Sequence, residues 1–219
     1  MTTTLTLYGY WRSSAAYRVR IALHLKGLVF ENRPVHLLRD GGEQHGAAYR
    51  RLNPQELVPC LLDGDTAITQ SIGIIEYLEE TRPTPALLPD DPAGRARVRA
   101  LALAVACDIH PLGNLRVLKQ LETQFAADEN QRSAWMRHWM AAGLGAFETL
   151  LTGSSATGHY CHGDTPGLAD ACLVPQVYNA VRWKLPLDDY PTIRRIHAAC
   201  GELDAFQRAA PEMQPDAVA

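Results

Sequence analysis

The sequence is poor in the features that mark several classes of protein, beginning with paired cysteines. Its cysteines are odd in number, widely spaced and without a Cys-x-x-Cys pair: Cys60, Cys107, Cys161, Cys172 and Cys200. This pattern argues against a disulfide framework or a zinc site, and it favours a reducing, cytoplasmic compartment in which cysteines are small buried residues. Cys161 and His162 are adjacent, but no further ligand is near them in the sequence, so we expect no metal site.

An excess of charge of one sign and a long apolar run are also missing. The formal net charge is −3, so there is no basic excess for binding nucleic acid or an anionic membrane. No uninterrupted apolar run approaches the roughly 20 residues of a membrane helix. Residues 1–4 have neither the basic nor the apolar region of a signal peptide. The composition is that of a globular protein, 47% hydrophobic, with length for one large or two small domains.

Residues 4–81 alternate between strand-like and helix-like patterns. The patterns predict strands over 4–10, 29–35, 58–62 and 67–69, and helices over 15–26, 41–52 and 71–81. Because a helix joins the first two strands, we expect them to be parallel with a right-handed crossover. Asp63-Gly64-Asp65 predicts a hairpin turn between the last two strands. Ser71 is expected to cap the helix that follows.

A run of four prolines within residues 83–92 predicts a linker. We therefore expect an N-terminal domain over 1–83, a linker over 84–92 and a C-terminal domain over 93–219. All patterns beyond the linker are helical and cover residues 93–121, 128–151, 167–182, 191–200 and 202–209. The second of these helices has an apolar face formed by Trp135, Trp139, Leu144 and Phe147. Residues 211–219 are predicted to be a loose tail.

Two segments of the N-terminal half have the chemistry of anion sites. The first strand leads into a helix through Ser13 and Ser14, and a helix N-terminus with free N–H groups and hydroxyls favours an anion. Gln70 and Ser71 stand at the start of a second helix, where they could bind a carboxylate or form an ordinary cap. The residues alone leave both interpretations open.

A proline stands at the mouth of the third predicted strand, where it cannot donate a hydrogen bond to the sheet. If the Val58–Pro59 bond is cis, the backbone groups of Val58 turn outward as an edge for an extended ligand. The alternative is an ordinary trans proline at a strand start, which general frequencies favour.

Five segments, in this order and spacing, resemble one protein family. They are residues 13–23, 53–59, 70–78, 108–118 and 163–176, which cover nearly the whole chain. Together they resemble the zeta class of the glutathione transferase superfamily, which includes maleylacetoacetate and maleylpyruvate isomerases. The resemblance implies an α/β thioredoxin-like N-terminal domain followed by an all-α C-terminal domain, the glutathione transferase fold. It also implies a homodimer and a cis bond between Val58 and Pro59.

The resemblance implies glutathione as the cofactor and assigns its binding site. Gln70 and Ser71 would hold the γ-glutamyl carboxylate, Val58 would pair with the cysteinyl backbone, and Ser13 would face the thiol with help from Ser14. Gln55 and His110 would lie near the glycine end or the cysteine, and Asp108 and Asn114, from either subunit, would complete the site. Pro59 belongs to the site through its implied cis bond with Val58.

The thiolate of glutathione is the nucleophile, and a free thiol has a pKa near 8.5. A hydroxyl donor and a helix N-terminus stabilise the thiolate and so lower that pKa. Many zeta-class members carry a cysteine or threonine at the position of Ala15, which cannot donate a hydrogen bond. Thiolate stabilisation here therefore depends on fewer groups. Gly167 is a second departure, because it lacks the hydroxyl of the superfamily's capping box and leaves only the Asp170 half.

Three arginines match the positions that grip the substrate carboxylates in the maleylpyruvate isomerase branch. They are Arg12, Arg116 and Arg182. Any one of them alone would be read as a solvated surface charge. The joint set is suited to a small dicarboxylate held by bidentate pairing. Arg18 and Arg20, within the first helix, are expected to be structural or interfacial.

The resemblance therefore implies a glutathione-dependent cis–trans isomerase of a maleyl keto acid. Maleylpyruvate is favoured over maleylacetoacetate by the arginine set and by residues 202–206, which resemble that branch. One alternative is a glutathione transferase or dehalogenase acting on small electrophiles. Another is a non-enzymatic binding module, for which Ala15 and Gly167 are the sequence support.

Overall fold

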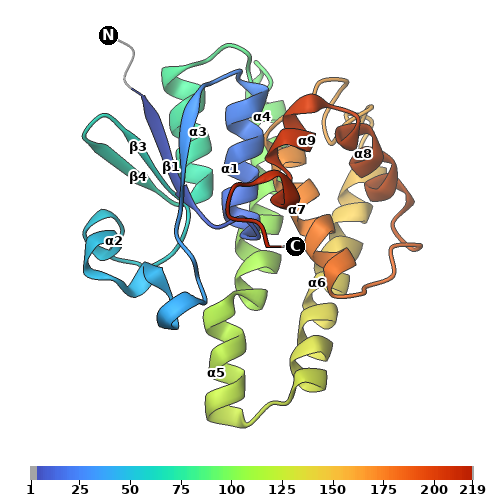
Figure 1. Cartoon of the computed structure of the whole chain (residues 1–219). Helices are drawn as coiled ribbons and strands as arrows, with labels where there is room; N and C mark the ends of the chain where they lie inside the picture. The colour runs from blue at the N-terminus through green and yellow to red at the C-terminus, as the bar shows by residue number, and fades with distance from the viewer. Residues whose placement is uncertain (1–3, 219) are drawn as a thin grey trace. The chain divides into compact units, whose positions relative to one another are not determined.

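The computed structural model describes residues 4–218 and divides into two compact units (Figure 1). The first contains the residues up to Leu87 together with the C-terminal segment from Glu202, and the second is Leu88–Gly201. The predicted linker thus contains the boundary between them. Residues 1–3, part of the segment that lacks the features of a signal peptide, and residue 219, the end of the predicted tail, lie outside the described residues.

The first unit contains a four-stranded mixed sheet in the order β2-β1-β3-β4. Its strands are β1 (Leu5–Gly9), β2 (Phe30–Pro34), β3 (Cys60–Asp63) and β4 (Thr66–Thr69). β1 is parallel to β2 and antiparallel to β3, and β4 returns antiparallel to β3. With helix α1 (Ser14–Leu25) after β1 and helix α3 (Ser71–Thr81) after β4, this order confirms the predicted thioredoxin-like domain.

The core of the first unit lies between the sheet and the two helices, which pack against each other (Figure 1). Leu7 and Leu61 of the sheet and Ile21, Ile74 and Leu78 of the helices have no exposed surface. These side chains recur at period two in the strands and at helical spacing in the helices, so burying one face of each element removes them from water.

The predicted helix over 41–52 is wrong in its first half. The structure has two 3₁₀ turns, Arg39–Gly41 and Glu43–His45, followed by the short helix α2 (Ala47–Leu52). Gly41 and Gly42 have φ values of 82° and 111°, which a helix cannot accommodate. The cap prediction for Ser71 is also wrong: α3 begins at Ser71, and Gln70 occupies the N-cap position without a capping side-chain bond.

The C-terminal segment belongs to the first unit through α9 (Asp204–Ala209), which packs on α1 (Figure 1). The predicted loose tail is therefore wrong for the residues that the structure describes. Gln214 is buried and donates to the carbonyl oxygens of Arg208 and Ala210 at 3.0 and 2.8 Å. Asp216 accepts a hydrogen bond from the backbone N–H of Trp11 at 2.9 Å. Long-range contacts of this kind leave no periodic pattern in the sequence.

The second unit is helical, as predicted, but the helix expected over 93–121 is interrupted. Helix α4 (Pro92–Leu103) continues into a π-helical turn (Ala104–Ile109) and a 3₁₀ turn (His110–Gly113) before α5 (Leu115–Phe125). Pro111 has no N–H for the helical ladder, which explains why a regular α-helix does not continue through it. The stretch Pro92–Phe125 is by length and composition apolar enough to cross a membrane, but a single such helix is weak evidence, since core helices of soluble proteins pass the same test.

Three further helices complete the second unit: α6 (Glu129–Thr152), α7 (Leu168–Arg182) and α8 (Pro191–Gly201). Asp128 caps α6 by accepting the N–H of Gln131 at 2.8 Å. Leu144 and Phe147 are buried as predicted, whereas the two tryptophans of that face are only partly buried. α7 is the most buried of these helices and lies against α4 and α8.

Asp170 holds the start of α7, because its carboxylate accepts the N–H groups of Gly167 and Cys161, both at 2.9 Å. This confirms that only the Asp170 half of the capping box is present. Asp164 accepts the N–H of His159 within the preceding loop. Four cysteines are buried as expected, but Cys107 is exposed on the π-helical turn.

Candidate active site

The N-terminus of α1 is the first part of the site. Ser13 is the N-cap, and its Oγ accepts the N–H of Ala16 at 3.2 Å, which leaves its own hydroxyl proton to donate. Ser14 is buried within the first turn, and Ala15 beside it is partly exposed. The guanidinium of Arg12 lies over the ring of Trp11, with 5.1 Å from Cζ to the ring centroid. The turn therefore offers one hydroxyl donor and the positive end of a helix.

The loop before β3 is held in place by hydrogen bonds from its own residues and from α2. Asn53 donates to the carbonyl oxygen of Leu57 at 2.6 Å and accepts the N–H of Gln55 at 3.0 Å. The hydroxyl of Tyr49 donates to the same Leu57 carbonyl at 2.7 Å. The Val58–Pro59 bond is cis, as the resemblance implies.

The start of α3 lies beside this loop and is linked both to it and to α1. Gln70 Nε2 donates to Gln55 Oε1 at 2.8 Å, and Arg18 Nη1 donates to Ser71 Oγ at 3.4 Å. Gln70 has a φ of 66°, a conformation that costs free energy for a residue other than glycine. The first unit therefore brings together the predicted glutathione residues of three segments around two helix N-termini, an arrangement that suits anionic groups.

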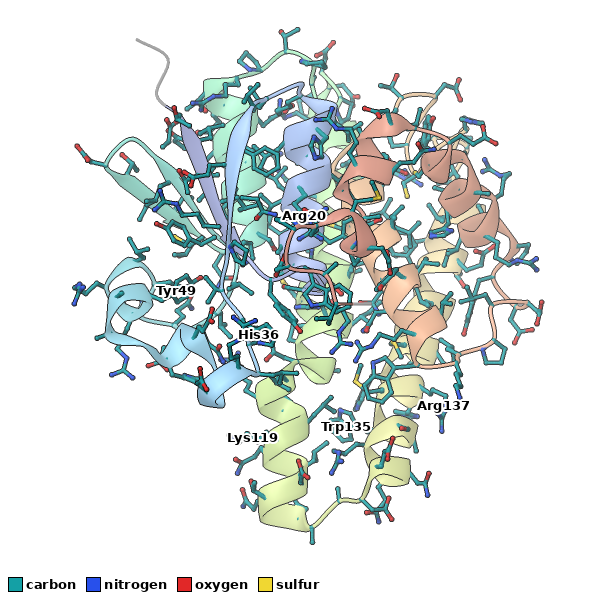
Figure 2. All side chains as sticks on the ribbon, viewed as in Figure 1. Arg20, His36, Tyr49, Lys119, Trp135 and Arg137 are labelled. Carbon is teal, nitrogen blue, oxygen red and sulfur yellow. The ribbon has the colours of Figure 1, made fainter. Side chains whose placement is uncertain are left out.

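Buried arginines stabilise the turn that presents Ser13. Arg20, which is 1% exposed, donates to the carbonyl oxygens of Tyr10, Trp11 and Ala209 at 3.5, 2.9 and 2.9 Å (Figure 2). Burial lowers the pKa of Arg20 to about 10. Arg18 is equally buried, so the expected structural role of both residues is confirmed. Sequence reasoning missed the contribution of Ala209 and Asp216, because neither residue type nor spacing marks them.

The second unit contains the other predicted residues. Asp108 is exposed on the π-helical turn, and His110 begins the 3₁₀ turn after it. Asn114 is the N-cap of α5, where its Oδ1 accepts the N–H of Arg116 at 3.1 Å. The side chain of Arg116 is exposed on the first turn of α5. These four residues thus lie close together in the chain, within residues 108–116, at helix ends and turns.

Arg182 is exposed at the last residue of α7. Its Nη1 donates to Asn179 Oδ1 at 3.3 Å, and its guanidinium lies 5.3 Å from the ring centroid of Trp183. Asn179 is one turn before it on the same helix face and lines a small cavity inside the second unit. Sequence reasoning did not single out this cavity, because its walls come from three separate segments.

The cavity is formed by the π-helical and 3₁₀ turns, α6 and α7. Its walls include Ile109, His110, Trp139, Gln176 and Asn179. Close packing shapes it, because a Cβ atom on Gly113 would lie 2.6 Å from the sulfur of Met136. The outcome is a small space with polar and apolar walls in about equal parts, with room for about one water-sized group.

The buried thiols Cys60 and Cys161 are poorly suited to act as nucleophiles. Cys60 follows Pro59 directly, and burial raises the pKa of its thiol to about 11. Burial also raises the pKa of Cys161 well above the ordinary value. Among residues 4–218, no group of three or more His, Cys, Asp or Glu side chains is arranged to hold a metal ion. The N-termini of α1 and α3 are therefore the groups of this site best suited to hold an anionic ligand.

Comparison with known proteins identifies relatives over nearly the full length. Residues 12–81 match the model of the glutathione S-transferase N-terminal domain. The chain is 53% identical to a probable maleylacetoacetate isomerase from Vibrio cholerae, covering 98% of this chain and 99% of that protein. It is 54% identical to a maleylpyruvate isomerase from a Ralstonia species, covering 97% and 99%.

Solved structures agree with the sequence relatives. One is a holo maleylpyruvate isomerase, described as a bacterial zeta-class glutathione S-transferase, with a TM-score of 0.94 and 52% identity over 97% of this chain and 100% of that one. Another is a maleylacetoacetate isomerase from Methylobacterium extorquens with bound malonate and glutathione. Its TM-score is 0.94, with 42% identity over 98% of this chain and 100% of that one.

Proposed function

This chain belongs to the zeta class of the glutathione S-transferase family, and from that premise we propose that it is a glutathione-dependent isomerase that converts a maleyl keto acid to its fumaryl isomer. The observation that carries the proposal is the pair of helix N-termini in the first unit, one capped by Ser13 and one begun by Ser71. Two such ends suit a ligand with both a carboxylate and a thiolate, which glutathione has.

Glutathione is the cofactor, and each end of the first-unit site matches one of its groups. We assign the γ-glutamyl carboxylate to Gln70 and Ser71, because the N-terminus of α3 adds N–H donors and positive potential there. The cysteinyl backbone pairs with Val58 beside Pro59, and Gln55 is held near it by its bond with Gln70.

The other cofactor residues lie in the second unit. Asp108, His110 and Asn114 occupy one short stretch at the end of the π-helical turn. We assign them to the cysteine and glycine portions of glutathione, contributed by either subunit of a homodimer. The closely related solved structures support this assignment through their shared fold, and size-exclusion chromatography with light scattering tests the dimer.

Ser13 is the group that activates the sulfur. Its Oγ already accepts from Ala16, so its own proton is free to be donated to the thiolate. Each unit by which the thiol pKa falls corresponds to about 1.36 kcal/mol of preference for the thiolate. Ala15 contributes no donor, so Ser13, the N–H groups of the first turn and the nearby Ser14 carry this role.

The reaction needs no net consumption of glutathione. The thiolate adds to the alkene carbon next to the carboxylate, and the electron pair of the double bond moves to the conjugated keto oxygen as an enolate. The carbon–carbon bond is now single and rotates. Collapse of the enolate expels the thiolate and restores the double bond in the trans form. The protein binds the acid in place and stabilises the charge of the intermediate.

Arg12, Arg116 and Arg182 are the groups that bind the substrate carboxylates. Arg116 and Arg182 present exposed guanidinium groups near the ends of their helices, and arginine matches a carboxylate in bidentate geometry. A solved relative that holds malonate with glutathione supports a dicarboxylate as the class of ligand. We propose maleylpyruvate as the preferred acid because of this arginine set; relatives of both names are about equally similar.

The decisive assay mixes the protein with maleylpyruvate or maleylacetoacetate and follows the loss of ultraviolet absorbance with and without glutathione. Turnover that requires glutathione but leaves its concentration unchanged is the expected result. Net loss of glutathione with a halogenated or other small electrophile, and no turnover of either acid, would instead identify a transferase or dehalogenase. Binding of glutathione with no turnover of any of these compounds would identify a binding module.

A further inference from the structure

Three side chains of the second unit, Gln176, Trp139 and Trp183, have buried polar atoms with no hydrogen-bond partner among residues 4–218, and the first two of them line one cavity. Gln176 on α7 is 1% exposed, and neither its Oε1 nor its Nε2 has a hydrogen-bond partner among residues 4–218. The Nε1 of Trp139 on α6 is likewise buried without a partner within the described chain. Buried polar atoms are nearly always satisfied, because removing them from water unpaired is costly. These atoms therefore point to a ligand.

Both side chains line the same small cavity, whose walls also include the apolar Ile109 and Met140 and the polar His110 and Asn179. Its size is about that needed by one water molecule or one oxygen-containing group, not by a whole substrate. The available donors are a neutral amide N–H and a neutral indole N–H. They match an uncharged or weakly charged oxygen, whereas a carboxylate would draw on arginines.

The cavity is connected to a predicted substrate arginine through one of its wall residues, Asn179. Gln176, Asn179 and Arg182 follow each other at intervals of three residues, and Arg182 bonds to Asn179 at 3.3 Å. A helix rises about 1.5 Å per residue, so Gln176 and Arg182 are separated by about 9 Å along its axis. Asn179 therefore joins the wall of the cavity to the guanidinium that we assign to a substrate carboxylate.

We propose that the cavity of Gln176 and Trp139 is the subsite for the substrate's keto oxygen, the atom that becomes the enolate. This inference rests on the proposed isomerase function and extends it. When the thiolate adds, the alkene electron pair moves to this oxygen, and the two N–H groups donate hydrogen bonds to it. When the thiolate leaves, the pair returns and no proton is transferred. Gln176 Oε1 accepts the hydroxyl proton of the neighbouring enol in a diketo acid.

The test uses Gln176→Leu and Trp139→Phe, which remove the donors and keep similar volumes. We expect kcat to fall about 100- to 1,000-fold for each, as for loss of one donor to a developing oxyanion, while glutathione affinity by calorimetry stays unchanged. Matched controls are Gln124→Leu, an exposed glutamine on α5, and Trp135→Phe. Trp135 lies between α5 and α6 and donates to the Leu112 carbonyl at 2.8 Å (Figure 2). Its loss should affect thermal stability more than kcat.

A second measurement does not depend on turnover. Calorimetry compares 2-oxoglutarate with glutarate, which differ only by the keto oxygen, in the presence of glutathione. The wild-type protein should bind the oxo acid about tenfold more tightly, and Gln176→Leu should reduce this preference to about one. If Gln176→Leu does not fold, Gln176→Met and Trp139→Phe are tested in the same way.

The results separate this proposal from the proposed function. If the wild-type protein is an active isomerase and the variants keep its kcat and its oxo-acid preference, the keto subsite alone is overturned. If the variants in that case also have a lower melting temperature, the cavity is assigned to structural water. An inactive wild-type protein that keeps a Gln176-dependent oxo-acid preference would overturn the isomerase and support the subsite. Failure of the wild-type protein to prefer the oxo acid would overturn the subsite.

Discussion

Arg18 and Arg20 of the first unit differ in their surroundings from Arg116 and Arg182 of the second. In the first unit, Arg18 and Arg20 of α1 are 1% exposed, and Arg20 donates to three carbonyl oxygens that join the Ser13 turn to α9. In the second unit, Arg116 and Arg182 are exposed near helix ends. A buried guanidinium must be satisfied by the protein and so serves structure, whereas an exposed one can exchange water for a carboxylate. The same residue type therefore stabilises the first unit at Arg20, whereas our proposal assigns ligand binding to the exposed Arg116 and Arg182.

The largest expected effect tests the buried side of this comparison. Arg20→Met leaves the carbonyl oxygens of Tyr10, Trp11 and Ala209 without their donor. We expect the free energy of unfolding to fall by about 3 kcal/mol, measured by denaturant titration. Arg116→Met, which replaces an exposed arginine in the same way, should change it by less than about 0.5 kcal/mol. Equal free energies of unfolding for Arg20→Met and Arg116→Met would contradict this difference between buried and exposed arginines.

The exposed side is tested by activity. Arg116→Ala and Arg182→Ala should each lower kcat/KM for the maleyl acid about 10- to 100-fold, since each removes a charge-assisted bond worth about 1.5–3 kcal/mol. Affinity for glutathione should stay the same. Lys119→Ala removes an equal charge from the same helix, α5, and serves as the control (Figure 2). If Lys119→Ala has the same effect, general electrostatic attraction and not a specific contact is responsible.

The contact between α1 and α9 also predicts a pH dependence of stability. Burial, and secondarily the charge of Arg208 on α9, lower the pKa of His24 to about 4. The unfolded chain therefore takes up a proton near pH 6.5 that the folded protein does not, and stability is lost as the pH falls from about 6.5 to about 4. We expect a loss of about 1–2 kcal/mol, reduced from the full shift because the ring is partly exposed.

Denaturant titrations at pH 7 and pH 4.5 measure this loss, and His24→Gln should diminish it. The same loss in His24→Gln would assign the acid sensitivity to other groups. That result would show that His24 does not add to the stabilisation that the buried arginines of the first unit provide.

The smallest effect concerns thiolate activation. Ser13→Ala removes the hydroxyl donor, so it should raise the pKa of bound glutathione and move the rising limb of the pH–rate profile to higher pH by about one unit, or about 1.4 kcal/mol. Ala15→Thr adds a hydroxyl two residues after Ser13, in the first turn of α1. In the wild-type background it should shift the rising limb of the profile to lower pH. An unshifted profile in Ser13→Ala would remove Ser13 from activation.

Sequence patterns predicted most of the elements because their signals are local. The bounds of α3 match the predicted helix, and the β3–β4 hairpin follows the Asp63-Gly64-Asp65 turn, since both depend on apolar spacing and turn residues a few positions apart. The same reasoning extended a helix through Pro111, because an Ala- and Leu-rich pattern continues on both sides and the π-helical turn has no signature of its own.

The residues of the candidate site also differ in whether local sequence signals mark them. Residues at helix starts, such as Ser13, Gln70 and Asn114, could be predicted because a helix N-terminus is read from neighbouring residues. Gln176 could not, since in the sequence it is one polar residue within a buried helix. It becomes significant only when the turn of Ile109 and the indole of Trp139 close a cavity around it.

The sequence by itself determined the order of elements, the two helix N-termini suited to anions and the family resemblance on which glutathione chemistry depends. Only the tertiary structure decided which arginines are buried, that the segment from Glu202 packs on α1, and that Gln176 and Trp139 share a cavity. The physical reason is the separation along the chain of the residues that interact. Helix ends and turns depend on residues within a few positions, whereas burial and hydrogen-bond satisfaction depend on groups brought together from distant parts of the chain.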